Sequence, residues 1–419
     1  MNTIFPTVEG SNVKCSNDRH TTSPTPWDVI AKYGCFSNEY ERQWWLDSGA
    51  LIARYLQMCQ YDLDQQYAYL LFLRQVVIPS LGPYPPVRRS FLNEAKIGLE
   101  LSVNFESSGH PIFRMTLDPS NADSGNLLDP FNIRAVERVV DKLAIIKPKG
   151  FDRTLCHRFM DDFIISDIQT NKIYNETTID ERVASCMLAF DFKEGEVGVK
   201  EYFWPQMASR AHGKSIHEML RNALSRIEGQ MSSSAAAELV MTYMEGSNNH
   251  LREIVFFAWD FVEVSKSRLK LYVWEKDISL TKVQELWTLG GKVKGPAIDQ
   301  GFKLVEKLWT IMKMGERKPW LPFLFNYEIS PGKEEPLPKV YFPIDDGNDL
   351  ETALAIAEWF RVLGWNDRAD SYVDQVRHLQ PNRDLSKTSG LQTLVIFSFK
   401  ATGPYTTIYY HPLATCPSA

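Results

Sequence analysis

The feature that most constrains this chain is a series of five candidate β-hairpins with helical segments between them. Alternating apolar and polar positions predict strand pairs at residues 98–105 and 113–117, 185–192 and 197–204, 254–262 and 268–274, 323–329 and 339–343, and 394–399 and 405–410. The last four hairpins begin about seventy residues apart, which indicates a repeat at the level of architecture.

Helical periodicity fills most of the chain between the hairpins. Apolar spacing of 3.6 residues predicts helices at 37–78, 131–145, 154–167, 212–226, 231–245, 296–313 and 349–378. Ten antiparallel strands with helices between them predict an α+β fold, a ten-stranded antiparallel β-barrel surrounded by α-helices. Closure removes exposed strand edges, and ten strands leave a lumen wide enough for a ligand. A two-domain α+β arrangement is the alternative.

The N-terminal residues and the overall charge bear on location and partners. Residues 1–25 are polar and predict a flexible tail, which leaves 26–419 for a single barrel domain. The chain has 46 basic and 52 acidic residues, a net charge of −6 and no Lys/Arg block, which disfavours nucleic acid. The absence of a signal-like or membrane-length apolar stretch, together with six scattered cysteines, predicts a cytoplasmic protein without membrane contact. The expected oligomeric state is a monomer or a homodimer.

The second strands of three successive hairpins share the pattern Lys-x-Tyr. It occurs at Lys200 and Tyr202, at Lys270 and Tyr272, and at Lys339 and Tyr341. Side chains two residues apart on a strand share a face, and the opposite faces of these strands are apolar. If the apolar faces pack under helices, the Lys-x-Tyr faces line the lumen. The alternative is a solvated strand face, where Lys and Tyr are common.

A lumen with these side chains is suited to a compact polyanion. It would collect the cations Arg114, Lys200, Arg268, Lys270 and Lys339, which makes it strongly positive although the chain is acidic. Charge-assisted hydrogen bonds contribute roughly 1.5–3 kcal/mol each, so several can hold a diphosphate without metal. Tyrosine hydroxyls donate to phosphate, and tyrosine ring faces stabilise a cation. This combination indicates ionisation of an allylic diphosphate.

One acidic run has the spacing of a metal–diphosphate motif. It is Asp345-Asp346-Gly347-Asn348-Asp349, and it lies in a loop before an expected helix. Asp and Asn are good N-cap residues, so we interpret the run as a helix cap. The eight histidines show no metal-ligand spacing, and the sequence predicts no metal site.

At the level of motifs, the chain resembles the fungal aromatic (indole) prenyltransferases of the dimethylallyltryptophan synthase family. The resemblance runs from about residue 26 to 412 and depends on the order and spacing of several short motifs. These are Gln65-Gln66-Tyr67, Leu99-Glu100-Leu101-Ser102, Lys200-Glu201-Tyr202-Phe203, Arg268-Leu269-Lys270-Leu271-Tyr272, Leu286-Trp287-Thr288-Leu289-Gly290-Gly291, Pro338-Lys339-Val340-Tyr341, and Tyr405 with Tyr409.

The resemblance implies a fold, a reaction and a set of site residues. The fold is the barrel of αββα repeats known as the ABBA or PT barrel, and the reaction is metal-independent transfer of an isoprenyl group, usually dimethylallyl, from its diphosphate to an indole. Glu100 matches the carboxylate that hydrogen-bonds the indole N–H. The positions that match diphosphate binding are Arg114, Lys200, Arg268, Lys270 and Lys339, and those that match cation shielding and diphosphate binding are Tyr202, Tyr272, Tyr341, Tyr405 and Tyr409.

Two departures from the family pattern bear on the acceptor. We place Leu92, Met187 and Val255 in the acceptor pocket. Members that accept free tryptophan carry Arg at the position of Val255 and Lys at that of Met187. An acceptor carboxylate facing Val255 would be unpaired and costly, although Arg252 lies three residues away.

The resulting expectation is an enzyme of secondary metabolism. It would transfer dimethylallyl from dimethylallyl diphosphate, its only required co-substrate, to a tryptophan-derived cyclic dipeptide or larger indole alkaloid. Two alternatives stay open from the sequence, a dimethylallyltransferase acting on free tryptophan and a non-catalytic barrel that binds an anion.

Overall fold

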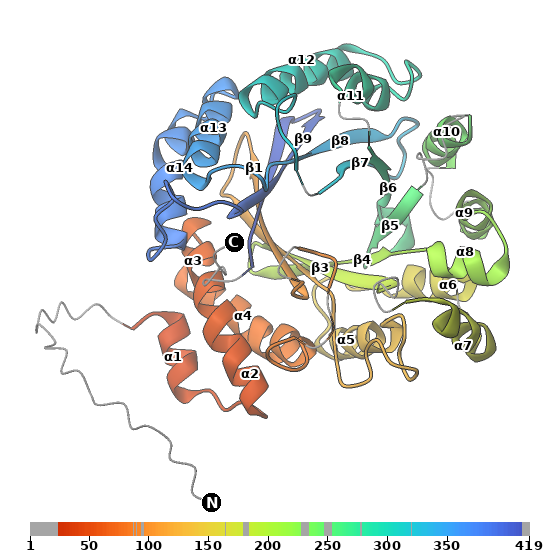
Figure 1. The fold of residues 1–419 in the computed structure, drawn as a ribbon, viewed down its shortest axis with the longest axis horizontal. Coiled ribbons are helices and arrows are strands. Elements are labelled where there is room, and N and C mark those ends of the chain that lie inside the picture. Colours follow the sequence, from red (N-terminus) through yellow and green to blue (C-terminus); the bar gives the residue numbers. More distant parts are fainter. Residues whose placement is uncertain are drawn as a thin grey trace, which may run out of the picture.

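The ten predicted strands form one closed antiparallel barrel (Figure 1). The computed structural model describes residues 24–86, 88, 90–93, 96–163, 165–178, 184–227, 234–246, 254–276, 279–319 and 321–412. The strands are β1 (Leu99–Glu106), β2 (Ile112–Leu117), β3 (Cys186–Lys193), β4 (Glu196–Phe203), β5 (Ile254–Asp260), β6 (Leu269–Glu275), β7 (Phe323–Ile329), β8 (Leu337–Pro343), β9 (Gln392–Lys400) and β10 (Gly403–Tyr410).

Sequence neighbours pair all around the barrel, and β1 closes it on β10. The closing register sets Ser102 opposite Tyr409 and Glu106 opposite Tyr405. The barrel prediction is therefore confirmed, and the two-domain alternative is wrong. The division into a tail at 1–25 and a single domain at 26–419 stays a prediction, and residues 1–23 lie outside the described residues.

Helices surround the barrel on its outside (Figure 1). They are α1 (Pro26–Tyr33), α2 (Glu39–Trp44), η1 (Trp45–Gly49), α3 (Ala50–Met58), α4 (Leu63–Phe72), η2 (Leu73–Val77), η3 (Ile78–Ser80), α5 (Ile133–Ile146), α6 (Thr154–Phe163), α7 (Asp167–Glu176), α8 (Gln206–His212), α9 (Ile216–Ser225), α10 (Ser234–Glu245), η5 (Val264–Lys266), α11 (Leu280–Trp287), α12 (Pro296–Ile311), α13 (Asp349–Val362) and α14 (Asn366–Leu379). Within the described residues, no helix is both long and apolar enough to cross a membrane.

The helix prediction needs several corrections, and α1, α7, α8 and α11 were not predicted. The segment 349–378 is two helices, because α13 ends at Val362, Gly364 takes a positive φ of 78°, and α14 begins only at Asn366. The segment 154–167 likewise ends early, at Phe163, and α7 begins at Asp167 behind its cap Ser166. The interpretation of the acidic run as a cap is confirmed, since the Asn348 side chain accepts from the backbone N–H groups of Leu350 and Glu351.

The main core lies between the outward face of the barrel and the helices. Apolar outward side chains of the strands, among them Val199, Phe203 and Leu271, are buried there. Aromatic contacts fix the layer: the ring of Phe159 on α6 lies 4.8 Å from that of Trp259 on β5. With the outward faces consumed by this layer, the alternate side chains of every strand are left for the lumen.

Candidate active site

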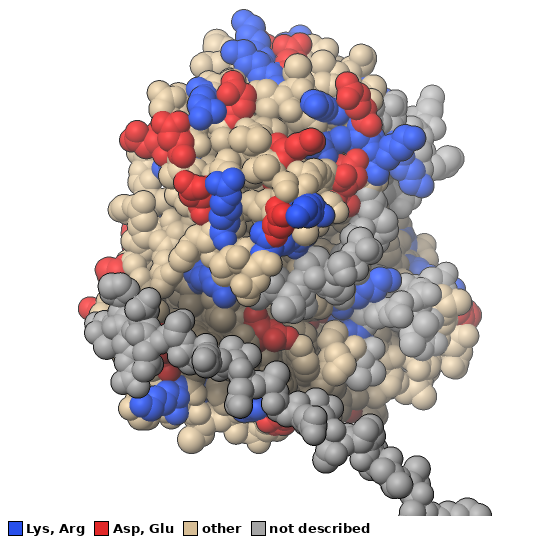
Figure 2. Space-filling model, turned by 60° about the vertical axis from the view of Figure 1, so that its left-hand side comes forward, with Lys and Arg blue, Asp and Glu red and all other residues tan. Residues whose placement is uncertain are grey.

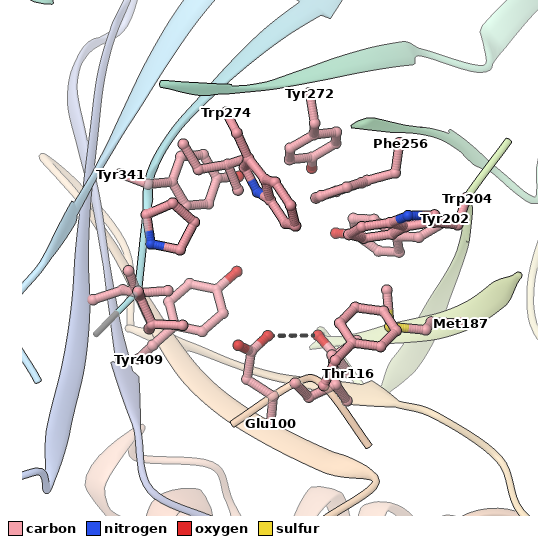
Figure 3. Close-up of a pocket in the computed structure, with 16 residues that line it drawn as sticks. Glu100, Thr116, Met187, Tyr202, Trp204, Phe256, Tyr272, Trp274, Tyr341 and Tyr409 are labelled. Carbon is pink, nitrogen blue, oxygen red and sulfur yellow. Dashed lines mark hydrogen bonds between the residues drawn. The ribbon is translucent and has the colours of Figure 1, made fainter. Parts of the chain in front are cut away.

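The lumen contains two adjoining chambers of opposite character. The first is apolar and is lined by Phe91, Leu92, Glu100, Thr116, Met187, Tyr202, Trp204, Phe256, Tyr272, Trp274, Leu321, Pro322, Leu324, Tyr341, Leu394 and Tyr409. Figure 3 shows the labelled side chains pointing from different strands toward one central space. Trp274 is 37% exposed, which marks a side of the chamber that solvent reaches.

An aromatic stack forms one wall of the apolar chamber. The rings of Trp204 and Phe256 are stacked with centroids 4.9 Å apart, and those of Phe256 and Tyr272 with centroids 4.1 Å apart. This wall offers flat π-surface to a planar aromatic ligand and to a carbocation. The strand register explains the inner pair of the stack, because Phe256 on β5 and Tyr272 on β6 are cross-strand partners.

Glu100 is the one carboxyl group among the described residues that line the apolar chamber. Its Oε2 accepts a hydrogen bond of 3.2 Å from the Thr116 hydroxyl, drawn as the dashed line in Figure 3. Burial among apolar side chains raises the pKa of Glu100 to about 8, and the Thr116 hydrogen bond opposes that rise. A group with this pKa can accept a hydrogen bond from an N–H and can exchange a proton near neutral pH.

The second chamber is polar. It is lined by Ser102, Arg114, Met115, Thr116, Ala189, Asp191, Lys200, Tyr202, Arg268, Lys270, Tyr272, Glu328, Lys339, Tyr341, Ile396, Lys400, Tyr405, Thr407 and Tyr409. All five predicted cations are therefore brought together, and the solvated-face alternative for the Lys-x-Tyr pattern is wrong. Lys400 on β9 is a sixth cation in the chamber and was not predicted.

Three carboxylates, of which Asp260 and Glu328 are buried and Asp191 is partly exposed, bridge the cations in pairs. Asp191 contacts Arg114 at 3.3 Å and also pairs with Lys200. Asp260 binds Arg268 at 2.7 Å and Lys270 at 3.0 Å. Glu328 contacts Arg268 at 3.4 Å and Lys339 at 2.6 Å. Each carboxylate stands on the first strand of its hairpin.

These ion pairs set the protonation of the polar chamber. Burial alone would raise the pKa of Asp260, but the charges of Lys270 and Arg268 hold it well below its usual range. The pKa values of Asp191 and Glu328 are lowered in the same way by the cations that pair with them. Burial lowers the pKa of Lys270 to about 8, against the opposing charge of Asp260. The carboxylates therefore stay ionised near neutral pH.

The lumen is positive, but less so than the five predicted cations alone suggest. A fourth carboxylate, Glu106, binds Lys400 at 2.9 Å, so the six cations of the chamber are paired with four carboxylates, of which Asp191 and Glu328 line the chamber, and two positive charges are in excess. The physical reason is desolvation, since several unpaired buried cations would each cost much free energy. The outer surface is mixed too, because Figure 2 shows acidic and basic side chains interspersed on the face it presents.

The tyrosines divide into two groups by position. Tyr202, Tyr272, Tyr341 and Tyr409 line both chambers and so form the boundary between them. Tyr405 lines the polar chamber alone. Burial raises the pKa of each of the four boundary tyrosines, so they are neutral phenols at physiological pH.

The three predicted acceptor-pocket residues differ in position. Leu92 and Met187 line the apolar chamber. Val255 stands at an irregularity in the β5–β6 register; it does not line the chamber but belongs to a small buried cluster with Trp204 and Phe256, which do. Arg252, considered as a substitute partner for an acceptor carboxylate, lies outside the described residues.

Sequence reasoning missed the bridging carboxylates although a signal for them existed. Each lies between two outward-facing apolar residues on the first strand of a hairpin, in Phe190-Asp191-Phe192, Trp259-Asp260-Phe261 and Tyr327-Glu328-Ile329. The same alternation that identified the Lys-x-Tyr face assigns these acids to the lumen. Thr116, one strand from Glu100, could have been found in the same way.

Comparison with known proteins agrees with this geometry. The sequence pattern of the tryptophan dimethylallyltransferase family matches residues 41–375. The prenyltransferase penG of Penicillium thymicola is 46% identical over 98% of this chain and 94% of its own, and the prenyltransferase asqH2 of Emericella nidulans is 45% identical over 94% and 90%. A crystal structure of NotF in complex with brevianamide F and DMSPP superposes with a TM-score of 0.86 at 30% identity, covering 94% of this chain and 100% of that one.

The chain belongs to the tryptophan dimethylallyltransferase family. It is therefore an aromatic prenyltransferase of the barrel fold, and the alternative of a non-catalytic barrel is wrong.

Proposed function

We propose that this prenyltransferase transfers a dimethylallyl group from dimethylallyl diphosphate to the indole ring of a neutral, tryptophan-derived acceptor, without a metal. A tryptophan-containing cyclic dipeptide or a larger indole alkaloid fits this class. The observation that carries the proposal is the division of the lumen into a cation-lined chamber and an apolar chamber, joined along a boundary of four tyrosines.

The polar chamber would hold the diphosphate. Arg114, Lys200, Arg268, Lys270 and Lys339 present donors from four hairpins, and each can exchange part of its contact with a carboxylate for a phosphate oxygen. The excess of two positive charges complements the charge of the ester, a task that Mg²⁺ performs in other prenyl-transfer enzymes. This internal supply of charge supports metal-independent binding.

The carbon–oxygen bond would break at the boundary between the chambers. The electron pair stays with the diphosphate on the polar side, and the allylic cation lies among Tyr202, Tyr272, Tyr341 and Tyr409. Their rings stabilise the cation and exclude water that would trap it. A ring carbon of the acceptor then attacks the cation, in an electrophilic aromatic alkylation.

Glu100 would orient the acceptor and tune its reactivity. Its carboxyl group can accept the indole N–H as a hydrogen-bond donor, which raises electron density in the ring. The positive charge that builds up on the alkylated ring lowers the pKa of a nearby carboxyl group, so Glu100 shares in stabilising that charge.

The lining of the apolar chamber argues for a neutral acceptor over free tryptophan. Its described lining residues include no Lys or Arg, so a free carboxylate there would be buried without a partner. The brevianamide F bound in the NotF structure belongs to that protein, but it supports the same class of acceptor here.

The test is incubation with labelled dimethylallyl diphosphate and excess EDTA, with three acceptors offered separately. These are a tryptophan-containing cyclic dipeptide, free tryptophan, and an indole without a carboxyl group. We expect labelled product from the neutral acceptors and little from free tryptophan. Product that forms only with added Mg²⁺, or free tryptophan consumed fastest, would contradict the proposal.

A further inference from the structure

Tyr405 differs from the other lumen tyrosines in what surrounds it. The four boundary tyrosines line both chambers, whereas Tyr405 lines the polar one alone. Cations already lie over its ring: the Nζ atoms of Lys400 and Lys339 are 4.1 Å and 5.0 Å from its centroid, and the Arg114 guanidinium carbon is 5.6 Å away. A ring in this setting is poorly placed to stabilise an allylic carbocation.

The Tyr405 hydroxyl group also has an unusual environment. A guanidinium N–H of Arg114 donates a hydrogen bond to its oxygen, so that oxygen carries extra negative charge at little cost. Three cations from three strands surround the residue, Arg114 on β2, Lys339 on β8 and Lys400 on β9. The cross-strand partner of Tyr405 on β1 is Glu106, whose carboxylate forms an ion pair with Lys400 at 2.9 Å.

The surroundings of Tyr405 stabilise its phenolate. Burial opposes ionisation, but the charges of Arg114 and Lys339, with a further contribution from Lys400, lower the pKa of Tyr405 to about 7. The neighbouring Tyr409 lies on the same face of β10, four residues away, and its pKa is raised well above the usual value by burial and by the other tyrosines. Of these two tyrosines, only Tyr405 is poised to exchange a proton near neutral pH.

We propose that Tyr405 is a catalytic acid that donates its hydroxyl proton to the diphosphate leaving group. This rests on the proposed function, since it needs the diphosphate in the polar chamber. As the allylic C–O bond breaks, its electron pair passes to the diphosphate, which gains one negative charge. The O–H bond of Tyr405 breaks, its proton moves to that diphosphate oxygen, and the phenolate is held by Arg114, Lys339 and Lys400.

The proton balance of the full reaction closes. Alkylation of the acceptor releases one ring proton, and hydrogen diphosphate carries one proton out of the barrel. A proton returned to the Tyr405 phenolate from the acceptor, directly or through solvent, restores the starting state. Donor binding has a further consequence, because the negative charge of the ester favours the phenol and thus loads Tyr405 with the proton that it later gives.

The experiment measures proton uptake on donor binding, separately from turnover. A thiolodiphosphate analogue of the donor, in which sulfur replaces the bridging oxygen, is titrated calorimetrically into the protein at about pH 8 in two buffers of different ionisation enthalpy. We expect uptake of part of a proton per bound analogue in the native protein. The uptake should disappear in Tyr405→Phe and persist in Tyr409→Phe, the matched change on the same strand face.

Two further readouts distinguish an acid from a structural role. Ultraviolet titration of the empty protein should show one phenolate forming near neutral pH that Tyr405→Phe lacks. Turnover of Tyr405→Phe should fall by roughly 10²–10⁴-fold while the affinity for the analogue changes by less than about tenfold. Native protein that fails to bind the analogue would refute the donor chamber of the proposed function; binding with equal proton uptake in both variants would refute only the role of Tyr405.

Discussion

The two chambers of the lumen impose opposite behaviour on the same functional group. Glu100, in the apolar chamber, has one hydroxyl partner and a pKa raised to about 8 by burial. Asp260, which pairs with two cations of the polar chamber, is also buried, yet those cations, within 3.0 Å, hold its pKa below the usual range. Carboxyl groups that line one barrel are thus kept in different protonation states by the side chains one strand away.

This contrast has a direct consequence for bond cleavage. In the proposed function, an allylic diphosphate that spans the boundary would have its leaving group among the cations and its hydrocarbon among the aromatic rings. Heterolysis then separates charge along a direction that the protein has already polarised, with no reorganisation of the site during the reaction. The difference between the chambers is therefore the main catalytic device we infer for this enzyme.

Removing the ionisable group from the apolar chamber should have the largest effect. Glu100→Gln keeps a hydrogen-bond acceptor but cannot ionise, so turnover of the acceptor should fall by roughly 10²–10⁴-fold. Affinity for the thiolodiphosphate analogue, measured by calorimetry, should stay unchanged. Glu201→Gln is the matched control. Glu201 is also a buried glutamate, but it lies on β4 between Lys200 and Tyr202 and so faces away from the lumen. Full turnover in Glu100→Gln would exclude the role of Glu100.

Removing one charge from the polar chamber should act on the other substrate. Lys270→Met deletes a donor to phosphate and leaves Asp260 with Arg268 alone. A charge-assisted hydrogen bond is worth roughly 1.5–3 kcal/mol, so we expect donor affinity to fall by about 10–150-fold. Lys307→Met, an exposed lysine on α12, should change nothing. A variant that loses acceptor affinity instead would mean that the chambers are assigned the wrong way round.

The contrast in pKa predicts a pH dependence of stability that belongs to Glu100. Its pKa is about 8 in the folded protein and near the ordinary value of 4.5 in the unfolded chain, so the unfolded state loses its proton first as the pH rises. The free energy of unfolding therefore falls as the pH rises between those two pKa values, and it falls no further above the higher one. Chemical denaturation should show Glu100→Gln equal to the native protein at low pH and more stable above pH 8, by about 1–3 kcal/mol. A difference largest at acid pH would contradict the assignment.

Much of this site was predictable from strand alternation alone. The face shared by Lys200, Tyr202 and Trp204 does point into the lumen, because the period of a strand leaves no other choice once the opposite face is apolar. All ten strands lie within two residues of their predicted bounds. The helices were less predictable: α11 was missed, although its buried residues Val283, Leu286 and Trp287 have helical spacing.

The electrostatics could not be predicted from the same pattern. Lys270 could face either an open space for a phosphate or a carboxylate, and which of these it faces depends on its cross-strand neighbours on β5. The strand register that sets those neighbours cannot be derived from the positions of the cations in the sequence. The acidified hydroxyl of Tyr405 depends on cations from β2, β8 and β9, which are far apart in the chain. Such effects need three-dimensional proximity, since electrostatic interactions fall off with distance in space.

The smallest change that should still separate the chambers is at Thr116, whose hydroxyl donates to Glu100 at 3.2 Å. That hydrogen bond stabilises the ionised carboxylate and so opposes the effect of burial on the pKa of Glu100. Thr116→Val keeps the shape but removes the donor, at a net cost of about 0.5–1.5 kcal/mol, or roughly a two- to tenfold change in rate.

The pH–rate profile should shift upward by up to about one pH unit, because 1.4 kcal/mol corresponds to one unit of pKa. Thr116→Ser, which retains a hydroxyl, should keep the native profile. An unshifted profile in Thr116→Val would mean that the bound acceptor, and not the Thr116 hydroxyl, sets the pKa of Glu100.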